Sequence, residues 1–280
     1  LRTLVDHPGE GSPELAARVA RASGRAVQAE AFRKQVSRAR RLFAGFLVAE
    51  TTTGSLLLVG RGPSATDAVV VPACGALSDP LEPNFNVAPT LDVYVVYEDG
   101  SERKLDQFHW GLVPGFAKDI KIGNRMINAR AETLATNNSF KHSFARRRCI
   151  VPADGFYEWQ AVDEDGRTRK QPWYIQPRAE GDFFAMAGLL AAWKSPEGQD
   201  IVSTCVITTG PNEVMAPIHD RMPVLLAPEQ FDAWLDPAWR DVESLRRWLL
   251  PASAAAMMAM PVSARVSNAR NEGAELIEPA

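Results

Sequence analysis

The chain has 280 residues, of which 46% are hydrophobic and 23% are charged, and its formal net charge is −3. This composition is typical of a globular protein, and the length suffices for one large domain or two small ones. The mild negative charge argues against a protein that coats nucleic acid electrostatically, although it leaves room for a local basic groove. No apolar run reaches about 18 residues, so the sequence predicts no membrane span.

The three cysteines are widely separated and give no disulfide framework. Their number and spacing fit a reducing cytosol, so we expect a cytoplasmic protein. The chain begins at Leu1 without a signal-peptide pattern, which leaves the true start of the protein open. We expect no metal and no cofactor, because the sequence has no Cys-x-x-Cys pair, no His-x-x-x-His pair and no Gly-rich phosphate loop after a strand.

Residues 1–42 differ in composition from the rest of the chain. Alanine and arginine dominate from Pro13 to Arg41, and a helix that begins near Ser12 fits the pattern. Its apolar face is thin, so we expect an extension peripheral to the fold; a nucleic-acid-binding arm is the alternative. The remaining residues, 43–280, are expected to form one domain.

Within this domain, short strand-like runs alternate with turns, and a few helical segments lie between them. We expect strands at 46–49, 55–59, 92–98, 105–113, 149–159, 171–176, 182–190 and 201–209, with a surface loop at 60–84. We expect helices at 131–144, 212–216, 228–235 and 240–249. Many short strands with interspersed helices predict an α+β domain built mainly on antiparallel sheet.

The run 127–133 places polar side chains in a segment that is otherwise typical of buried strand. Asn128 and Arg130 are two residues apart, so on a strand they would project to one face. A carboxamide offers a donor and an acceptor, and a guanidinium offers a fork that fits phosphate. The alternative is an asparagine in a turn and a surface ion pair between Arg130 and Glu132.

Glu158 lies between aromatic residues in the run 156–159. A carboxylate with such neighbours is expected to be partly desolvated, which would raise its pKa toward the range of a general acid. The alternative is an exposed glutamate on an edge strand.

His219 lies in a segment, 215–223, that two prolines and two methionines are expected to hold as a short rigid loop. Its imidazole can move protons near neutral pH, although a lone histidine in a loop is also compatible with a structural role. Lys141 and the run 146–148 form a local basic cluster, with aromatic residues near it in sequence. This pattern indicates single-stranded nucleic acid, and a solvated helix end is the alternative.

Taken in order, these segments resemble one family, the SOS-response-associated peptidase (SRAP) proteins, which process abasic sites in DNA. The matching segments are 84–90, 110–114, 123–133, 147–159, 170–172, 187–189, 208–209, 216–223, 261–263 and 275–279. The resemblance covers about 84–280, or 43–280 with the first strands included, and so many motifs in a fixed order are specific. It implies a single domain with a barrel-like core and flanking helices.

The resemblance implies covalent chemistry on abasic sites in single-stranded DNA. Family members expose a cysteine as residue one, whose free α-amine attacks the aldehyde of the open sugar and whose thiolate then closes a thiazolidine ring. It also implies a self-cleaving peptidase activity that removes residues before the cysteine. We accordingly expect a DNA-repair protein of the SOS response, monomeric and associated with the nucleoid when bound to DNA.

The resemblance also assigns roles to residues of this chain. Asn128 orients the amine and the sugar, Glu158 shuttles protons during imine formation, and His219 protonates the sugar oxygen. The residues expected to hold the flanking DNA strand are Arg130, Arg221 and Trp110.

The chain departs from the family at its beginning. Family members start Met-Cys-Gly-Arg followed by an aromatic residue, and the best register here places Phe43 at the cysteine position and Gly45 at the arginine position. Either the start of the gene is misassigned and hides the cysteine, or the chain is a degenerate member that binds single-stranded DNA without cross-linking it. Cys74 would need cleavage before it, and Cys149 and Cys205 lie in expected strands as buried core thiols. A thiol peptidase that acts on other proteins is a third interpretation, but no cysteine motif supports it, and the nucleophile stays unknown.

Overall fold

The computed structural model of the protein describes residues 49–50, 55–59, 68–72, 84–100, 102–164, 166–179 and 182–280, the first three segments by their backbone alone. The expected extension at 1–42, the register point at Phe43 and the cysteine Cys74 lie outside these residues. Among the helices of the described part, none is both long and apolar enough to cross a membrane.

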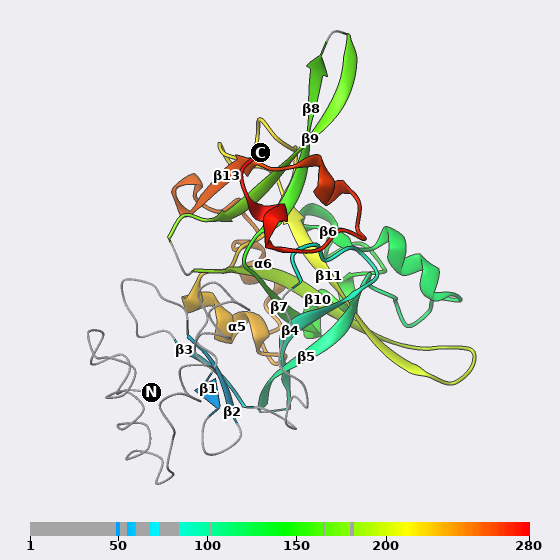
Figure 1. Ribbon diagram of the computed structural model, residues 1–280. Coiled ribbons are helices and arrows are strands. Elements are labelled where there is room, and N and C mark those ends of the chain that lie inside the picture. The colour runs from blue at the N-terminus through cyan, green and yellow to red at the C-terminus, as the bar shows by residue number, and fades with distance from the viewer. Residues whose placement is uncertain are drawn as a thin grey trace.

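Five strands close into a barrel at the centre of the molecule (Figure 1). They are β4 (Asp92–Asp99), β5 (Glu102–Trp110), β7 (Arg148–Ala153), β10 (Phe184–Lys194) and β11 (Asp200–Thr209). The order is β10-β7-β4-β5-β11, and the barrel closes because β10 also pairs with β11. Only the β5–β11 pairing of this ring is parallel. The predicted α+β fold with a mainly antiparallel, barrel-like core is therefore confirmed.

Strand β11 carries two further short strands on the barrel. β6 (Asn128–Arg130) pairs with it in parallel, and β12 (Met222–Pro223) pairs with it in antiparallel register. These two pairings bring the segment after residue 127 and the segment before residue 222 to the same strand end. The polar residues that the sequence singled out near 128 and 219 therefore meet at the end of β11.

A second sheet packs against the barrel and extends beyond it. It consists of β8 (Phe156–Glu164), β9 (Arg167–Pro177) and β13 (Met257–Pro261), in the order β13-β9-β8. The β8–β9 hairpin projects from the body of the molecule at the top of Figure 1. A third sheet joins β1 (Ala49–Glu50), β2 (Ser55–Val59) and β3 (Ala68–Pro72). The strand predicted at 55–59 is confirmed, whereas the loop predicted at 60–84 is wrong at residues 68–72, which form β3.

The alternation of side chains along the barrel strands fills two apolar clusters. In β7, Ile150 packs with Phe144 and Trp234 in the cluster beneath the helices. Its neighbours Cys149 and Val151 belong to the cluster between the barrel and the β13-β9-β8 sheet. Because both faces of the barrel wall are covered, β10 is buried along most of its length and its sequence is almost continuously apolar.

In the described part of the chain, short α-helices pack on one apolar cluster of the barrel. They are α4 (Lys141–Arg146), α5 (Phe231–Leu235) and α6 (Val242–Arg246). The 3-10 helices are η1 (Ile120–Arg125), η2 (Ala131–Thr133), η3 (Pro228–Gln230), η4 (Ala254–Ala256), η5 (Ala264–Ser267) and η6 (Ala274–Ile277). The helix predicted at 228–235 is confirmed as η3 followed by α5. The helix predicted at 240–249 is shorter, and it begins where the Asp241 carboxylate caps the Ser244 amide.

One predicted helix is wrong, and a second helix and one strand are interrupted, for local reasons. The stretch 131–144 begins as η2 and ends in α4, but residues 134–140 between them are not helical, since Asn137 accepts a hydrogen bond from the Ser139 amide and thereby competes with helical bonding. The stretch 212–216 is also a turn, because Asn212 accepts from two following amides. The strand predicted at 149–159 breaks between β7 and β8, where an added Cβ at Gly155 would lie 2.4 Å from Tyr174 Cζ.

The loop that leads from β5 to β6 depends on a close approach of two glycines. Gly111 has a φ of +144°, and a Cβ built on it would lie 2.8 Å from the Gly123 carbonyl oxygen. A Cβ on Gly123 would lie 2.5 Å from the Gly111 carbonyl oxygen. The two backbones therefore touch only because neither residue has a side chain. This contact folds the loop back and brings the chain to Asn128.

Candidate active site

The structure brings Glu158 and His219 together from distant parts of the sequence. Glu158 lies in β8, and His219 lies in the loop before β12; Glu158 Oε2 is 3.9 Å from His219 Nδ1. The side chains are 25% and 39% exposed, so both are reachable from solvent and neither belongs to the core. A carboxyl group and an imidazole at this separation can exchange a proton directly after a small movement, or through one water molecule.

Burial raises the pKa of the Glu158 carboxyl above its ordinary value of 4.5. The nearby His219 ring, the Trp159 backbone amide and Lys170 oppose this shift, whereas the Asp220 carboxylate adds to it. The predicted partial desolvation of Glu158 is therefore confirmed. Glu158 does lie on an edge strand, because β8 is the last strand of the β13-β9-β8 sheet, but its side chain is mostly buried. A raised pKa keeps a larger share of this carboxyl protonated near neutral pH, as a general acid requires.

The loop that carries His219 is held by turns and by a neighbouring strand. The His219 amide donates to the Met215 carbonyl at 2.9 Å, and the buried Met215 anchors the turn in the core. From β8, Gln160 Nε2 donates to the Pro217 carbonyl at 2.8 Å, while Gln160 Oε1 accepts from Trp173 Nε1 at 3.0 Å. Gln160 thus links the strand of Glu158 to the loop of His219. The sequence analysis missed this residue, because its partners are remote in the chain.

Asn128 and Arg130 project from β6 to one face, as their spacing predicted. Both are exposed, whereas Ala129 between them is fully buried. In the part of the chain that the structure describes, the side-chain carboxamide of Asn128 has no hydrogen-bond partner and the Arg130 guanidinium has no ion-pair partner. The alternative of an Arg130–Glu132 surface pair is wrong, because Glu132 pairs with Arg221. Both polar groups therefore remain available to a ligand.

Trp110 supports β6 from behind. Its indole Nε1 donates to the Ile127 carbonyl at 3.0 Å, directly before Asn128. The ring is half-buried. Trp110 thus fixes the position from which Asn128 projects, and only part of its ring is left to contact a ligand.

Arg221 forms a fork with the carboxylate of Glu132. Nη1 lies 2.7 Å from Glu132 Oε1 and Nη2 lies 3.0 Å from Oε2, and Nη2 also donates to the Thr208 carbonyl at 2.6 Å. Thr208 faces Arg130 in the pairing of β11 with β6, so this fork lies beside Arg130. The hydrogen bond from Arg221 lowers the pKa of Glu132, which keeps this carboxylate ionised.

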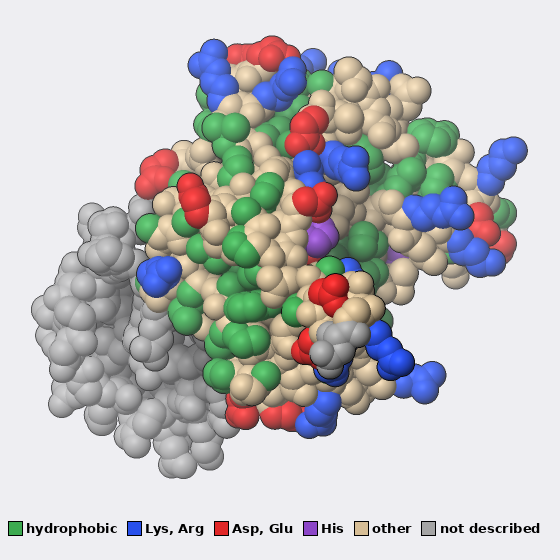
Figure 2. Space-filling model, turned by 90° about the horizontal axis from the view of Figure 1, so that it is seen from above, with side chains coloured by type: hydrophobic (Ala, Val, Ile, Leu, Met, Phe, Trp, Pro, Cys, Tyr) green, Lys and Arg blue, Asp and Glu red, His purple; other side chains and the backbone are tan. Residues whose placement is uncertain are grey.

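The end of the molecule that carries these residues is seen from above in Figure 2. Acidic and basic side chains are intermixed on this face, and a histidine side chain reaches its surface. The charge is therefore local rather than a continuous basic surface, in agreement with the overall charge of −3.

The predicted basic cluster at 141 and 146–148 is only partly correct. Lys141, Arg146 and Arg147 are exposed, but Arg148 is 3% exposed and serves the core. It donates to four backbone carbonyls, those of Phe144, Trp234, Asp236 and Trp239. Arg148 is therefore a structural residue and is not available to nucleic acid.

Neither described cysteine can serve as a nucleophile in its present environment. Cys149 and Cys205 are fully buried, as expected. Burial raises the pKa of the Cys149 thiol to about 12, and it raises that of Cys205 well above its ordinary value. A thiol that is not ionised near neutral pH is a poor nucleophile. A thiol peptidase built on either residue is therefore not supported.

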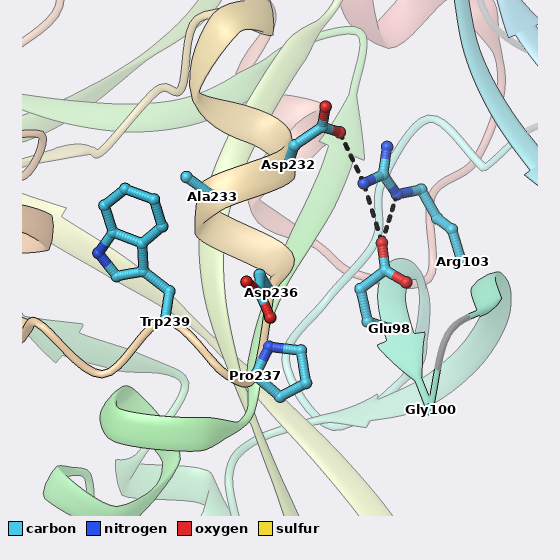
Figure 3. A pocket seen from close by; sticks show the side chains of 8 residues that line it. All are labelled: Glu98, Gly100, Arg103, Asp232, Ala233, Asp236, Pro237 and Trp239. Atoms are coloured by element: carbon cyan, nitrogen blue, oxygen red, sulfur yellow. Dashed lines mark hydrogen bonds and ion pairs between the residues drawn. The ribbon is translucent and has the colours of Figure 1, made fainter.

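A pocket of about 490 Å³ lies away from this end, between the β4–β5 turn and α5 (Figure 3). Arg103 stands in it between two carboxylates, with Nη2 at 2.9 Å from Glu98 and 2.8 Å from Asp232. Asp236 also lines the pocket, so its carboxylates outnumber its cation. An acidic pocket of this kind disfavours phosphate, and we do not assign it to the active site.

The fold and the site define a barrel protein with a carboxyl group and an imidazole close together at one end, where strand β6 exposes a carboxamide and a guanidinium. The family model described as SOS response associated peptidase (SRAP) matches residues 64–269. The chain belongs to this family, and the resemblance identified from the sequence is confirmed.

Relatives with curated names cover most of the described part. The abasic site processing protein YoqW of Bacillus subtilis (strain 168) is 44% identical over 196 residues, which are 70% of this chain and 86% of that protein. The abasic site processing protein YedK of Escherichia coli (strain K12) is 32% identical over 198 residues, 70% of this chain and 84% of that protein. A crystal structure of a protein from Bacteroides thetaiotaomicron superposes with a TM-score of 0.59 at 25% identity, covering 68% of this chain and 82% of that one.

Proposed function

We propose that this protein processes abasic sites by binding single-stranded DNA and forming a covalent thiazolidine cross-link with the abasic sugar. The observation that carries the proposal is the Glu158–His219 pair, whose atoms are 3.9 Å apart. Arg221, whose backbone meets His219, reaches Thr208 on β11, which pairs with the strand that exposes Asn128 and Arg130. Similarity to proteins named abasic site processing proteins supports it. The role belongs to DNA repair.

The chemistry needs a cysteine whose α-amine is free. The amine nitrogen adds to the aldehyde carbon of the open sugar, and the resulting carbinolamine loses water to give an imine. The thiolate sulfur then adds to the imine carbon while the imine nitrogen takes up a proton, which closes the ring. An α-amine has a pKa near 7.7–8.0, so a sizeable share of it is neutral and nucleophilic near neutral pH.

Each residue of the site has its own role in the proposed reaction. Asn128 orients the amine and the sugar through its carboxamide, since it is exposed and carries no competing hydrogen bond among the described residues. Glu158 donates the proton that lets water leave the carbinolamine, and in hydrolysis of the peptide bond before the cysteine it activates water. His219 protonates the sugar oxygen during ring opening. Arg130 and Trp110 hold the flanking DNA strand.

Incubation of the protein purified from its native cell with single-stranded DNA that contains one abasic site tests the proposal. We expect a DNA–protein adduct that survives denaturation, and the same DNA with an intact base should give none. The intact mass and first residue of the protein purified from its native cell should show a cysteine at position one. If the native protein begins with a cysteine and still gives no adduct, the proposal fails.

The best register, which sets Phe43 at the cysteine position, favours a second function for the chain. In this alternative the protein is a single-stranded DNA-binding module without cross-linking activity. Arg130 is its natural phosphate contact, because its guanidinium is exposed and has no ion-pair partner in the described part of the chain.

Arg130→Ala should weaken binding to single-stranded DNA under both functions. Loss of one phosphate contact lowers the magnitude of the slope of log K against log salt by about 0.7. Fluorescence anisotropy at several salt concentrations measures this slope. Arg167→Ala, on the projecting β8–β9 hairpin, removes an exposed arginine of equal charge and is the matched control. An unchanged slope for Arg130→Ala, or no binding even at low salt, would contradict this assignment.

A further inference from the structure

The Arg221 guanidinium is already engaged by protein groups. Its two terminal nitrogens meet both oxygens of Glu132, at 2.7 and 3.0 Å, and one of them also meets the Thr208 carbonyl at 2.6 Å. We call these three residues the Glu132 clamp. An isolated surface pair contributes little, but an arginine fork held at three acceptors has a fixed orientation. The clamp therefore ties the loop that contains Arg221 to η2 and β11.

The backbone of Arg221 in turn meets the ring of His219. The Arg221 amide donates to His219 Nδ1 at 3.1 Å. An amide N–H can only donate, so the neutral imidazole must offer Nδ1 as the acceptor and carry its proton on Nε2. A proton on Nδ1 instead would collide with this amide, although that nitrogen also lies 3.3 Å from the Arg221 carbonyl. Two backbone groups of one residue thus face the same ring atom.

Two carboxylates near Nδ1 compete with the Arg221 amide over which ring nitrogen carries the proton. Glu158 Oε2 lies 3.9 Å and Asp220 Oδ1 lies 3.4 Å from the same nitrogen. Without the Arg221 amide, these two carboxylates would favour a proton on Nδ1, because both are acceptors. The position of one backbone amide therefore decides which nitrogen of the neutral ring is the donor.

We propose that Glu132 and Arg221 are positioning residues, and that the Glu132 clamp fixes the Arg221 amide so that neutral His219 donates from Nε2. The importance of this tautomer for catalysis rests on the proposed function, in which the Nε2–H of His219 donates a hydrogen bond to the sugar oxygen. Arg221 acts on His219 through Glu132 and its own backbone.

Nitrogen-15 NMR of the histidine ring tests the clamp without DNA. The full chain labelled with ¹⁵N-histidine is recorded at alkaline pH, and His219→Asn identifies the signals of His219 by their loss. We expect one protonated nitrogen, Nε2, and one unprotonated nitrogen, Nδ1, in the wild type. In Glu132→Ala the two nitrogen shifts should move toward each other as the tautomers exchange, and Glu132→Gln, which keeps one acceptor, should show a smaller change.

Glu243→Gln is the matched control, since Glu243 pairs with Arg246 on α6 and makes no contact with the site. It should leave the His219 signals unchanged. A proton on Nδ1 in the wild type would overturn the proposal, and so would Glu132→Ala with unaltered His219 shifts. Because this readout uses no DNA and no cysteine, it decides the clamp even if the adduct assay fails.

Discussion

Glu158→Gln is expected to lower the rate of adduct formation at abasic sites by about 10²–10⁴-fold, the range that a positioned general acid or base contributes. Glutamine keeps the shape of the side chain but cannot donate and recover a proton. The effect should fall on the rate, and single-stranded DNA affinity should change little, because the carboxyl carries no phosphate contact. Quenched time courses on denaturing gels, with binding measured separately by anisotropy, separate the two quantities.

The same substitution should change the pH dependence of the rate. The neutral fraction of an α-amine rises as the pH approaches the pKa of the amine, near 7.7–8.0, whereas the protonated fraction of Glu158 falls as the pH passes the raised pKa of its carboxyl. Their product gives a bell-shaped profile in the wild type. Glu158→Gln should lose the falling limb that belongs to this carboxyl and keep the rising limb of the amine.

Stability should change in the opposite direction to activity. The folded state holds the Glu158 proton more tightly than the unfolded state, so between the two pKa values folding binds protons and stability falls as pH rises. Glutamine carries no charge to desolvate. Glu158→Gln should therefore gain in melting temperature relative to the wild type as pH rises above the ordinary value of 4.5.

Glu164→Gln is the matched control for the rate and for its pH profile. Glu164 lies on the same strand, β8, and its carboxylate pairs with Arg169 at the exposed part of the hairpin. It should form adducts at the wild-type rate with the wild-type pH profile. Glu158 would not be the proton donor if Glu158→Gln matched this control in rate.

The sequence singled out Glu158 and His219 but could not place them against each other. Aromatic neighbours marked Glu158 as partly desolvated, and proline and methionine neighbours marked the loop of His219. Their separation of 3.9 Å depends on strand β8 leaving the barrel and on the turn at Asn212, and both are set by contacts between remote residues. Short-range patterns carry no information on such contacts.

The partner of Glu132 shows why local spacing can mislead. Arg130 and Glu132 are two residues apart, which on a continuous strand would place them side by side. The strand β6 ends at Arg130, and the 3-10 helix η2 begins at the next residue. Glu132 therefore leaves the strand alternation and turns toward Arg221, which is remote in sequence.

The basic cluster fails as a prediction for a similar reason. The run 146–148 is uniform in sequence, but α4 ends at Arg146 and β7 begins at Arg148. The third arginine thus enters a buried strand, where it must find acceptors for its donors. It finds three of them at the ends of α4 and α5, where the last carbonyls have no partners within the helix, and the fourth at Trp239 in the turn after α5.

Arg148→Met is accordingly expected to destabilise the fold by about 3–5 kcal/mol, the range for a residue whose loss leaves buried polar groups unpaired. Four carbonyls would lose their donor: those of Phe144, Trp234, Asp236 and Trp239. Burial lowers the pKa of Arg148 only to about 10, so it is charged at neutral pH and its hydrogen bonds are charge-assisted. Arg148→Lys should recover part of the loss, because one ammonium cannot span all four carbonyls.

Urea unfolding of the full chain, followed by tryptophan fluorescence, measures this loss. Arg147→Met removes the same charge from the adjacent exposed position and should change the free energy of unfolding by less than about 0.5 kcal/mol. If Arg148 were instead part of a DNA-binding cluster, Arg148→Met would leave stability unchanged and weaken DNA binding. The two outcomes are opposite, because a guanidinium that uses four of its five N–H donors on carbonyls and is 3% exposed cannot reach phosphate.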